Sequence, residues 1–142
     1  MRLRSLSLTL LSIAMAVSAP AATAGDITLE IDNVASTDGK IGVSLVSEAG
    51  YAGKEKPVAA MLVTPTGPKT RVVIPNVAAG RYAIQVMHDR NANGKLDTNI
   101  VGIPTEPYGF SNDAAANFGP PDFADAAFQV GVAATVVKVT LQ

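Results

Sequence analysis

Short runs in which apolar and polar residues alternate recur along this chain, and they constrain its fold more than any other feature. Within 26–34 the apolar Ile27, Leu29 and Ile31 alternate with polar residues, and within 41–47 Ile41, Val43 and Leu45 resume the alternation. A period of two is the pattern of a strand with one buried face. Because an Asp38-Gly39 turn signal lies between the two runs, the sequence predicts that they form a hairpin.

The later runs extend this pattern to the end of the chain. The remaining strand candidates are residues 58–64, 70–77, 81–88, 127–130 and 134–141. With turns between them and no amphipathic helix, they predict an all-β fold, an antiparallel β-sandwich of about seven strands of the immunoglobulin-like or prealbumin-like kind. Residues 48–57 are expected to form a surface loop with at most a short helical turn. Tyr82 follows a glycine turn, so its ring is expected to pack while its hydroxyl bonds loop backbone.

The first 24 residues have the features of a secretory signal peptide. A basic start precedes an apolar run over 6–17, and small residues before Gly25 offer a cleavage site. We therefore expect residues 1–24 to be removed and residues 25–142 to form one β-sandwich domain that is periplasmic or secreted. An uncleaved signal anchor is the alternative. No membrane insertion is expected after the signal is removed.

The composition excludes several kinds of partner and site. Of the 11 Lys and Arg residues, two lie in the expected signal, so nine remain against 12 acidic residues. A mildly acidic domain argues against binding to nucleic acid or to anionic membranes. The chain has no cysteine. Disulfides, thiolate metal sites, a lipid-anchoring cysteine and a cysteine nucleophile are therefore all excluded.

The residues directly after the strand at 81–88 carry the clearest chemical pattern. Oxygen-bearing side chains stand at alternate positions, and a glycine and a further carboxylate follow. On a tightly curled loop this spacing directs oxygens toward one centre, as calcium loops require. The residues expected to bind calcium are Asp89, Asn91, Asn93, Lys95 through its carbonyl oxygen, and Asp97. The alternative is a loop whose side chains only hydrogen-bond their own backbone.

The loop departs from the twelve-residue calcium pattern at its last position. That pattern has a bidentate glutamate there, whereas this chain has Ile100. The missing ligand would come from Asn99, Glu106 or Asp113. With only two carboxylates in the loop, the expected dissociation constant is about 10⁻⁴ to 10⁻³ M, as in extracellular modules.

Residues 97–125 form an unusually long connection between predicted strands. They contain Tyr108, Phe110, Phe118 and Phe123, four of the seven aromatic residues of the chain. Disordered tracts are poor in aromatic residues, so we expect an ordered segment. It is expected to fold over one end of the sandwich with its aromatic side chains against the core.

The loop and the long segment together carry a family resemblance. The run from His88 to Asp97 is followed by 102–112, 118–123 and 126–128 in a characteristic order. This order resembles the bacterial family catalogued as domain of unknown function 2141. The resemblance implies a small exported β-sandwich and no established activity. The strand followed by an Asp-rich loop also looks like repeat domains of bacterial surface adhesins, whose similar loops bind calcium.

These features support two hypotheses of different classes. The first is a non-catalytic binding or structural module, which would present His88, Glu106, Tyr108 and Phe110 to a protein, a glycan or a small ligand. The second is a small hydrolase that uses His88, Asp89 and Glu106. No Gly-x-Ser-x-Gly elbow and no glycine-rich phosphate loop occur in the sequence, which disfavours serine-hydrolase and nucleotide chemistry.

Overall fold

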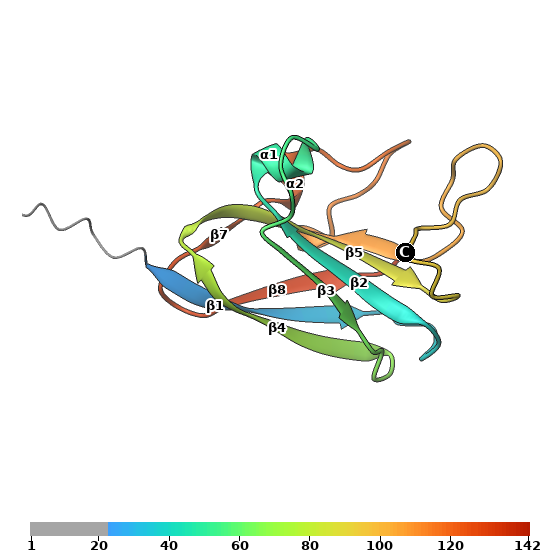
Figure 1. The fold of residues 1–142 in the computed structure, drawn as a ribbon, viewed down its shortest axis with the longest axis horizontal. Coiled ribbons are helices and arrows are strands. Elements are labelled where there is room, and N and C mark those ends of the chain that lie inside the picture. The colour runs from blue at the N-terminus through green and yellow to red at the C-terminus, as the bar shows by residue number, and fades with distance from the viewer. Residues whose placement is uncertain (1–22) are drawn as a thin grey trace, which may run out of the picture.

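The computed structural model describes residues 23–142, which form two sheets packed face to face (Figure 1). The predicted signal peptide falls on residues 1–24, of which 1–22 lie outside the described residues. The strands are β1 (Ala24–Asp32), β2 (Lys40–Val46), β3 (Ala59–Val63), β4 (Lys69–Ala78), β5 (Gly80–Asp89), β6 (Tyr108–Phe110), β7 (Phe128–Val130) and β8 (Thr135–Thr140). The helices are single turns: α1 (Glu48–Tyr51), the 3₁₀ turn η1 (Ser111–Asp113) and α2 (Phe123–Ala126).

The strand order confirms a sandwich-like all-β fold. One sheet has the order β4-β1-β8, and the other has the order β3-β2-β5-β6 with β7 also paired to β5. The sandwich is not purely antiparallel as predicted, because β1 and β8 run parallel. Parallel pairing follows from the chain path, since β1 and β8 are joined through the whole second sheet rather than by a turn.

The predicted hairpin of residues 26–34 and 41–47 is wrong. β1 pairs with β4 and β8, whereas β2 pairs with β3 and β5, so the two strands lie in different sheets. The Asp38-Gly39 pair, which suggested a hairpin turn, is explained instead by a close contact of Gly39. Gly39 has φ +66°, and a Cβ there would lie 2.0 Å from the carbonyl oxygen of Asp89. The glycine therefore lets the β1–β2 connection pass against the end of β5.

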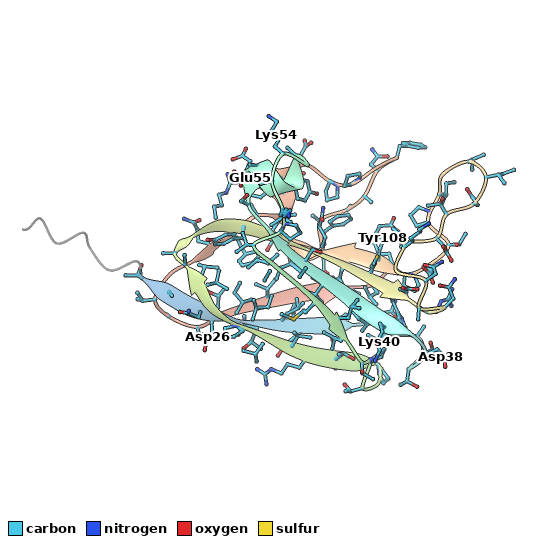
Figure 2. The ribbon with its side chains drawn as sticks, viewed as in Figure 1. Asp26, Asp38, Lys40, Lys54, Glu55 and Tyr108 are labelled. Carbon is cyan, nitrogen blue, oxygen red and sulfur yellow. The ribbon has the colours of Figure 1, made fainter. Side chains whose placement is uncertain are left out.

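The main core lies between the sheets and explains why the alternation in the sequence is so regular. Its fully buried members come from the inward positions of both sheets and include Ile27, Leu29, Ile31, Ile41, Leu45, Ile84 and Val139. Figure 2 shows these layers with their side chains. The tyrosine prediction is confirmed, because the Tyr82 ring joins this core and its hydroxyl donates to the carbonyl of Ala78 at 2.9 Å.

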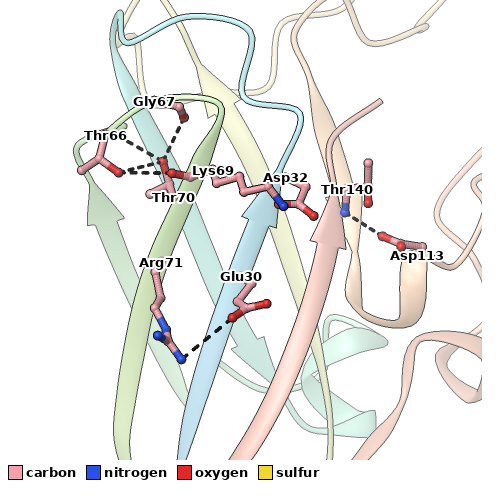
Figure 3. A network of polar contacts seen from close by, with 9 residues as sticks. All are labelled: Glu30, Asp32, Thr66, Gly67, Lys69, Thr70, Arg71, Asp113 and Thr140. Carbon is pink, nitrogen blue, oxygen red and sulfur yellow. Dashed lines mark hydrogen bonds and ion pairs between the residues drawn. The ribbon is translucent and has the colours of Figure 1, made fainter.

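The outer face of the β4-β1-β8 sheet carries pairs of opposite charges beside the exposed Val73 and Val136. Glu30 lies opposite Arg71, and Asp32 lies opposite Lys69, so opposite charges face each other across β1 and β4 (Figure 3). The Lys69 Nζ to Asp32 Oδ1 distance is 3.1 Å, and the Arg71 Nη2 to Glu30 Oε1 distance is 3.9 Å. Exposed pairs of this kind contribute little to stability, but they keep this face in water.

The long segment 97–125 is ordered, as predicted, but it also holds structure that the sequence pattern did not reveal. It contains β6, η1 and part of α2. A second small cluster forms where Phe110 and Phe123 pack with Tyr51 against Ala83 and neighbours. The prediction fails for Phe118, whose side chain is fully exposed at a loop tip instead of packing on the core.

Residue Ser111 fills a gap in the pairing of β5. One edge of β5 pairs with β7 near Gly80 and with β6 from Gln85 onward. Between them the Ser111 Oγ accepts from the backbone N–H of Ile84 at 2.9 Å and donates to the carbonyl of Ala126. The buried hydroxyl thus takes the place of a missing strand partner. Within residues 23–142 no helix is long and apolar enough to cross a membrane.

Candidate functional site

The loop after β5 is held by its first residue. Asp89 ends the strand and is 2% exposed. Its carboxylate accepts the backbone N–H of Asn93 at 3.0 Å and that of Gly94 at 2.6 Å. Gly94 has φ +80°, the conformation that favours glycine, so the chain can curl around this carboxylate. The curl brings the following side chains to one side of the loop.

The other predicted ligands form one network around Asp97. Asn91 Nδ2 donates to Asp97 Oδ2 at 2.6 Å, and Asn93 Nδ2 donates to Asp97 Oδ1 at 2.8 Å. The amide oxygens also accept backbone groups: Asn91 Oδ1 from the N–H of Asn93, and Asn93 Oδ1 from the N–H of Lys95. The amide oxygens bond loop backbone, as in the alternative expected from the sequence, and the amide nitrogens rather than the oxygens face the Asp97 carboxylate. The side chains bond their own backbone, and they also gather at one carboxylate.

The hydrogen bonds to Asp97 have an electrostatic consequence. The amides of Asn93 and then Asn91 lower the pKa of the Asp97 carboxyl below its ordinary value of 3.8, because they donate to its ionised form. The carboxylate therefore stays charged throughout the neutral and mildly acidic range. A negative charge held among oxygen-bearing side chains is the kind of centre that hard cations prefer.

Glu106, in the long segment that follows the loop, hydrogen-bonds the backbone at both ends of the loop. It is 6% exposed, and its carboxylate accepts the backbone N–H of Arg90 at 2.9 Å and that of Asp97 at 3.1 Å. The backbone N–H of Thr105 also donates to the carbonyl of Asp97 at 2.8 Å. The sequence raised Glu106 as a missing metal ligand and as part of a ligand surface. In the structure it is a buried residue that holds the two ends of the loop together, and we refer to it as the clasp.

His88 faces the main core, with no exposed surface. Its Nε2 lies 2.8 Å from the carbonyl oxygen of Asp38. Because a carbonyl only accepts, Nε2 must carry a hydrogen and donate it. Among the described residues Nδ1 has no hydrogen-bond partner. His88 therefore ties the β1–β2 connection to the end of β5 rather than forming part of a surface.

A groove of about 930 Å³ adjoins the loop on the outer face of the larger sheet. Its floor consists of two rows of side chains across neighbouring strands. The first row is Leu62, Gly42, Met87 and Tyr108. The second is Ala60, Ser44, Gln85 and Phe110. In these rows the small residues Gly42, Ser44 and Ala60 lie beside longer ones, and the Met87 side chain lies against Gly42.

Two loops form the walls of this groove. One wall comes from residues 96–104, directly after the candidate metal loop, and includes Val101 and Ile103. The other comes from residues 116–120 and includes Phe118. Both loops rise on the same side of the sheet, and Figure 1 shows them in orange tones above β2 and β5. Tyr108, labelled in Figure 2, lies beside the first wall.

Most of the chain matches a known protein family. A family model described as "Uncharacterized protein conserved in bacteria (DUF2141)" matches residues 29–138. The chain belongs to this family. The match to DUF2141 runs from β1 to β8 and therefore includes the loop, the clasp and both groove walls. Neither the search of curated proteins nor that of solved structures gave a match.

In this DUF2141 chain the predicted site residues divide into two groups. Asp89, Asn91, Asn93 and Asp97 come together in one loop, as the alternate spacing indicated. Of the four residues expected at a ligand surface, Tyr108 and Phe110 line the groove, whereas His88 and Glu106 are buried. Within residues 23–142 no group of three or more His, Cys, Asp or Glu side chains could hold a metal ion. Any metal in the loop would therefore depend on the amide oxygens.

The floor of the groove was missed by sequence reasoning. Gly42, Ser44 and Ala60 are small residues at outward positions of two strands, and in the sequence they read only as the polar or neutral half of an alternating pattern. A signal was present: an outward position of a solvated strand usually carries a long polar side chain. Small residues there indicate that something lies over the sheet.

Proposed function

We propose that this protein is an exported, non-catalytic binding module in which the loop 89–97 binds calcium and thereby holds the long segment in place. The observation that carries the proposal is the gathering of the Asn91 and Asn93 side chains at the Asp97 carboxylate. With the two amides turned over, the carboxylates of Asp89 and Asp97 and the amide oxygens of Asn91 and Asn93 would make an oxygen-only donor set. Such a set suits calcium better than softer metals.

The curled backbone supports the same reading. In twelve-residue calcium loops the first side chain supports the turn at the sixth residue, which is glycine. Here Asp89 accepts the N–H of Gly94 at the equivalent distance along the chain. Calcium would replace the two amide-to-carboxylate contacts with contacts through amide oxygens. Because the loop lacks an acidic twelfth residue, the affinity would be modest.

Only a few residues separate the loop 89–97 from the residues that line the groove. Glu106 bonds both ends of the loop, and Tyr108 follows two residues later. On the other side Asp97 leads directly into the wall formed by 96–104. An ion that stiffens the loop would therefore also stiffen one wall and one edge of the floor. This supports a surface for a protein, glycan or small ligand that includes Tyr108 and Phe110.

No observation favours the alternative, a small hydrolase using His88, Asp89 and Glu106. Each of these side chains is buried. The two carboxylates are engaged by backbone N–H groups, and His88 bonds a backbone carbonyl. None of the three lines the groove. A general base must reach a substrate proton, and these groups face the interior of the protein instead.

Isothermal titration of calcium into chelator-treated protein tests the proposal. We expect one site with a dissociation constant of about 10⁻⁴ to 10⁻³ M and a rise in melting temperature at millimolar calcium. Asp97→Asn should weaken binding strongly. Asp125→Asn makes the same chemical change on exposed α2 and should leave binding unchanged. No heat and no rise in melting temperature in the unmodified protein would refute the calcium site.

A further inference from the structure

The groove on the outer face of the larger sheet differs in chemistry from every other outer surface that the strands form. None of the residues that line it carries a charge. By contrast, the outer face of the β4-β1-β8 sheet carries paired charges such as Glu30 with Arg71 (Figure 3). Solvated faces of antiparallel sheets are normally polar. A groove without charges on an outer sheet face therefore indicates that something other than water contacts it.

From this we infer that the groove binds a neutral, largely apolar small molecule. Its volume of about 930 Å³ lies within the range of about 300–1,000 Å³ that is usual for small-molecule sites. An ionic ligand would lose its hydration without gaining an opposite charge, which is costly. The polar groups available along the floor are the Ser44 hydroxyl, the Gln85 amide and the Tyr108 hydroxyl. They suit a ligand with one or two uncharged hydrogen-bonding groups.

The shape of the floor separates this reading from a flat protein contact. Ser44 and Ala60 have short side chains on the groove floor, whereas Gly42 is covered by Met87, since a Cβ on Gly42 would lie 3.1 Å from Met87 Cε. Two loops stand off the sheet on either side. A walled hollow encloses a small molecule, whereas a broad partner needs a surface that its own side chains can cover.

The exposed apolar residues at the rim point to the same class of ligand. Leu62, Ile103 and Phe118 border the groove and are 70%, 59% and 109% exposed. Contiguous exposed apolar surface at a concavity commonly marks a binding site for apolar ligands. This inference rests on the proposed binding role of the long segment, which forms both walls, but it does not require calcium.

Fluorescence titration with N-phenyl-1-naphthylamine, a neutral apolar dye, tests the inference. We expect saturable binding of one dye per protein. Decanol should displace the dye, whereas decanoate and decyltrimethylammonium, which have the same chain length and opposite charges, should displace it at least about tenfold less well. Absence of saturable binding, or equal displacement by all three competitors, would overturn the inference.

Two groove variants with matched controls locate the dye. Ala60→Trp fills the floor and should weaken dye binding by at least about tenfold, whereas Val73→Trp, on the outer face of the other sheet, should not. Phe118→Ser and Ile100→Ser both change a fully exposed loop residue, but only Phe118 lines the groove, so only Phe118→Ser should weaken binding. Because both loop residues are exposed, neither change should impair folding. This second pair therefore tests the groove even if Ala60→Trp fails to fold. Unchanged binding in both groove variants would place the dye elsewhere and refute the inference.

Sedimentation of the unmodified protein and of Ala60→Trp, and a repeat of the dye titration in chelator, distinguish the remaining outcomes. If the unmodified protein is a dimer that Ala60→Trp dissociates, the groove is covered by a second copy and the inference is wrong. Dye binding that persists in chelator, in a protein that shows no calcium heat, supports the groove and refutes the calcium site. Calcium binding without dye binding supports the calcium site and refutes the groove inference.

Discussion

At the scale of single residues, Asp89 is the side chain on which the candidate loop depends most. A buried carboxylate is unfavourable unless hydrogen bonds compensate its desolvation. Here two backbone N–H groups do so, from Asn93 and Gly94. The same bonds satisfy two amides that the curled loop would otherwise leave unpaired. The residue therefore organises the loop whether or not an ion is bound.

Asp89→Asn should destabilise the protein even without calcium. The change keeps the shape but turns one acceptor into an N–H₂ donor that faces a backbone N–H. We expect a loss of about 2 kcal/mol in the free energy of unfolding, measured by urea denaturation in chelator. Asp125→Asn on the exposed surface is the control and should be nearly neutral. An equal effect of the two changes would show that the two bonds to Asp89 contribute nothing.

Asp97 predicts a dependence of stability on pH. Its folded pKa is lowered by the Asn93 and Asn91 amides, so its contribution is present above the ordinary pKa of 3.8 and is lost as the pH falls through the lower folded value. Asp97→Asn should therefore lower the urea midpoint at pH 6 in chelator. The difference from the unmodified protein should shrink as the pH falls below 3.8. A difference that stays constant down to acid pH would contradict this.

At the scale of elements, the short strand β6 links the two sheets. It pairs with β5 over three positions, and its residue Tyr108 also exchanges backbone hydrogen bonds with Gln142, after the end of β8. This strand thus closes one edge between the two sheets. The closure requires Gly109, because a Cβ there would lie 2.6 Å from Val139 Cγ1 and 2.9 Å from the carbonyl oxygen of Thr140.

Gly109→Ala should open this edge. The added methyl group meets backbone as well as a core side chain, so neither can move away cheaply. We expect a loss of about 1–3 kcal/mol in the free energy of unfolding. Gly131→Ala is the control, since nothing lies within 4 Å of a Cβ at Gly131. Thermal unfolding of both variants measures the difference, and similar midpoints would contradict the packing argument.

Ser111 joins three elements through one hydroxyl, and its removal should be costly for that reason. Ser111→Ala leaves the buried N–H of Ile84 and the carbonyl of Ala126 without this partner. An unsatisfied buried polar group costs about 1–3 kcal/mol. Hydrogen exchange should show faster exchange at Ile84, while amides of β1 and β4 keep their protection. Unchanged exchange at Ile84 would rule out this role.

At the scale of the whole molecule, the two sheets enclose a core that is separate from the candidate loop. The buried apolar residues lie between the sheets and do not include the candidate loop. The two outer faces then diverge: one is solvated by paired charges, and the other is partly covered by α1 and α2 and partly hollowed into the groove. Stability and the proposed binding function are thus located in different layers.

Removal of calcium should therefore leave the fold intact. Chelator-treated protein is expected to keep its far-UV circular dichroism and to unfold in one cooperative step. Calcium at ten times its dissociation constant should add only about 1.4 kcal/mol, which corresponds to about 4–8 °C in melting temperature. Loss of β signal on chelation would show instead that the ion is required for folding.

The sequence by itself determined the local features of this protein. Alternation predicted the strands other than β6 to within a few residues, and the Asp89 to Asp97 spacing predicted a curled loop with polar side chains at alternate positions, because both depend on neighbours a few positions apart. Only the tertiary structure decided which strands share a sheet. It also decided that β1 and β8 run parallel, that Glu106 clasps the loop, and that Ser44 and Ala60 lie on the floor of a groove. These features arise from contacts between residues far apart in the chain, and no periodicity within one segment encodes them.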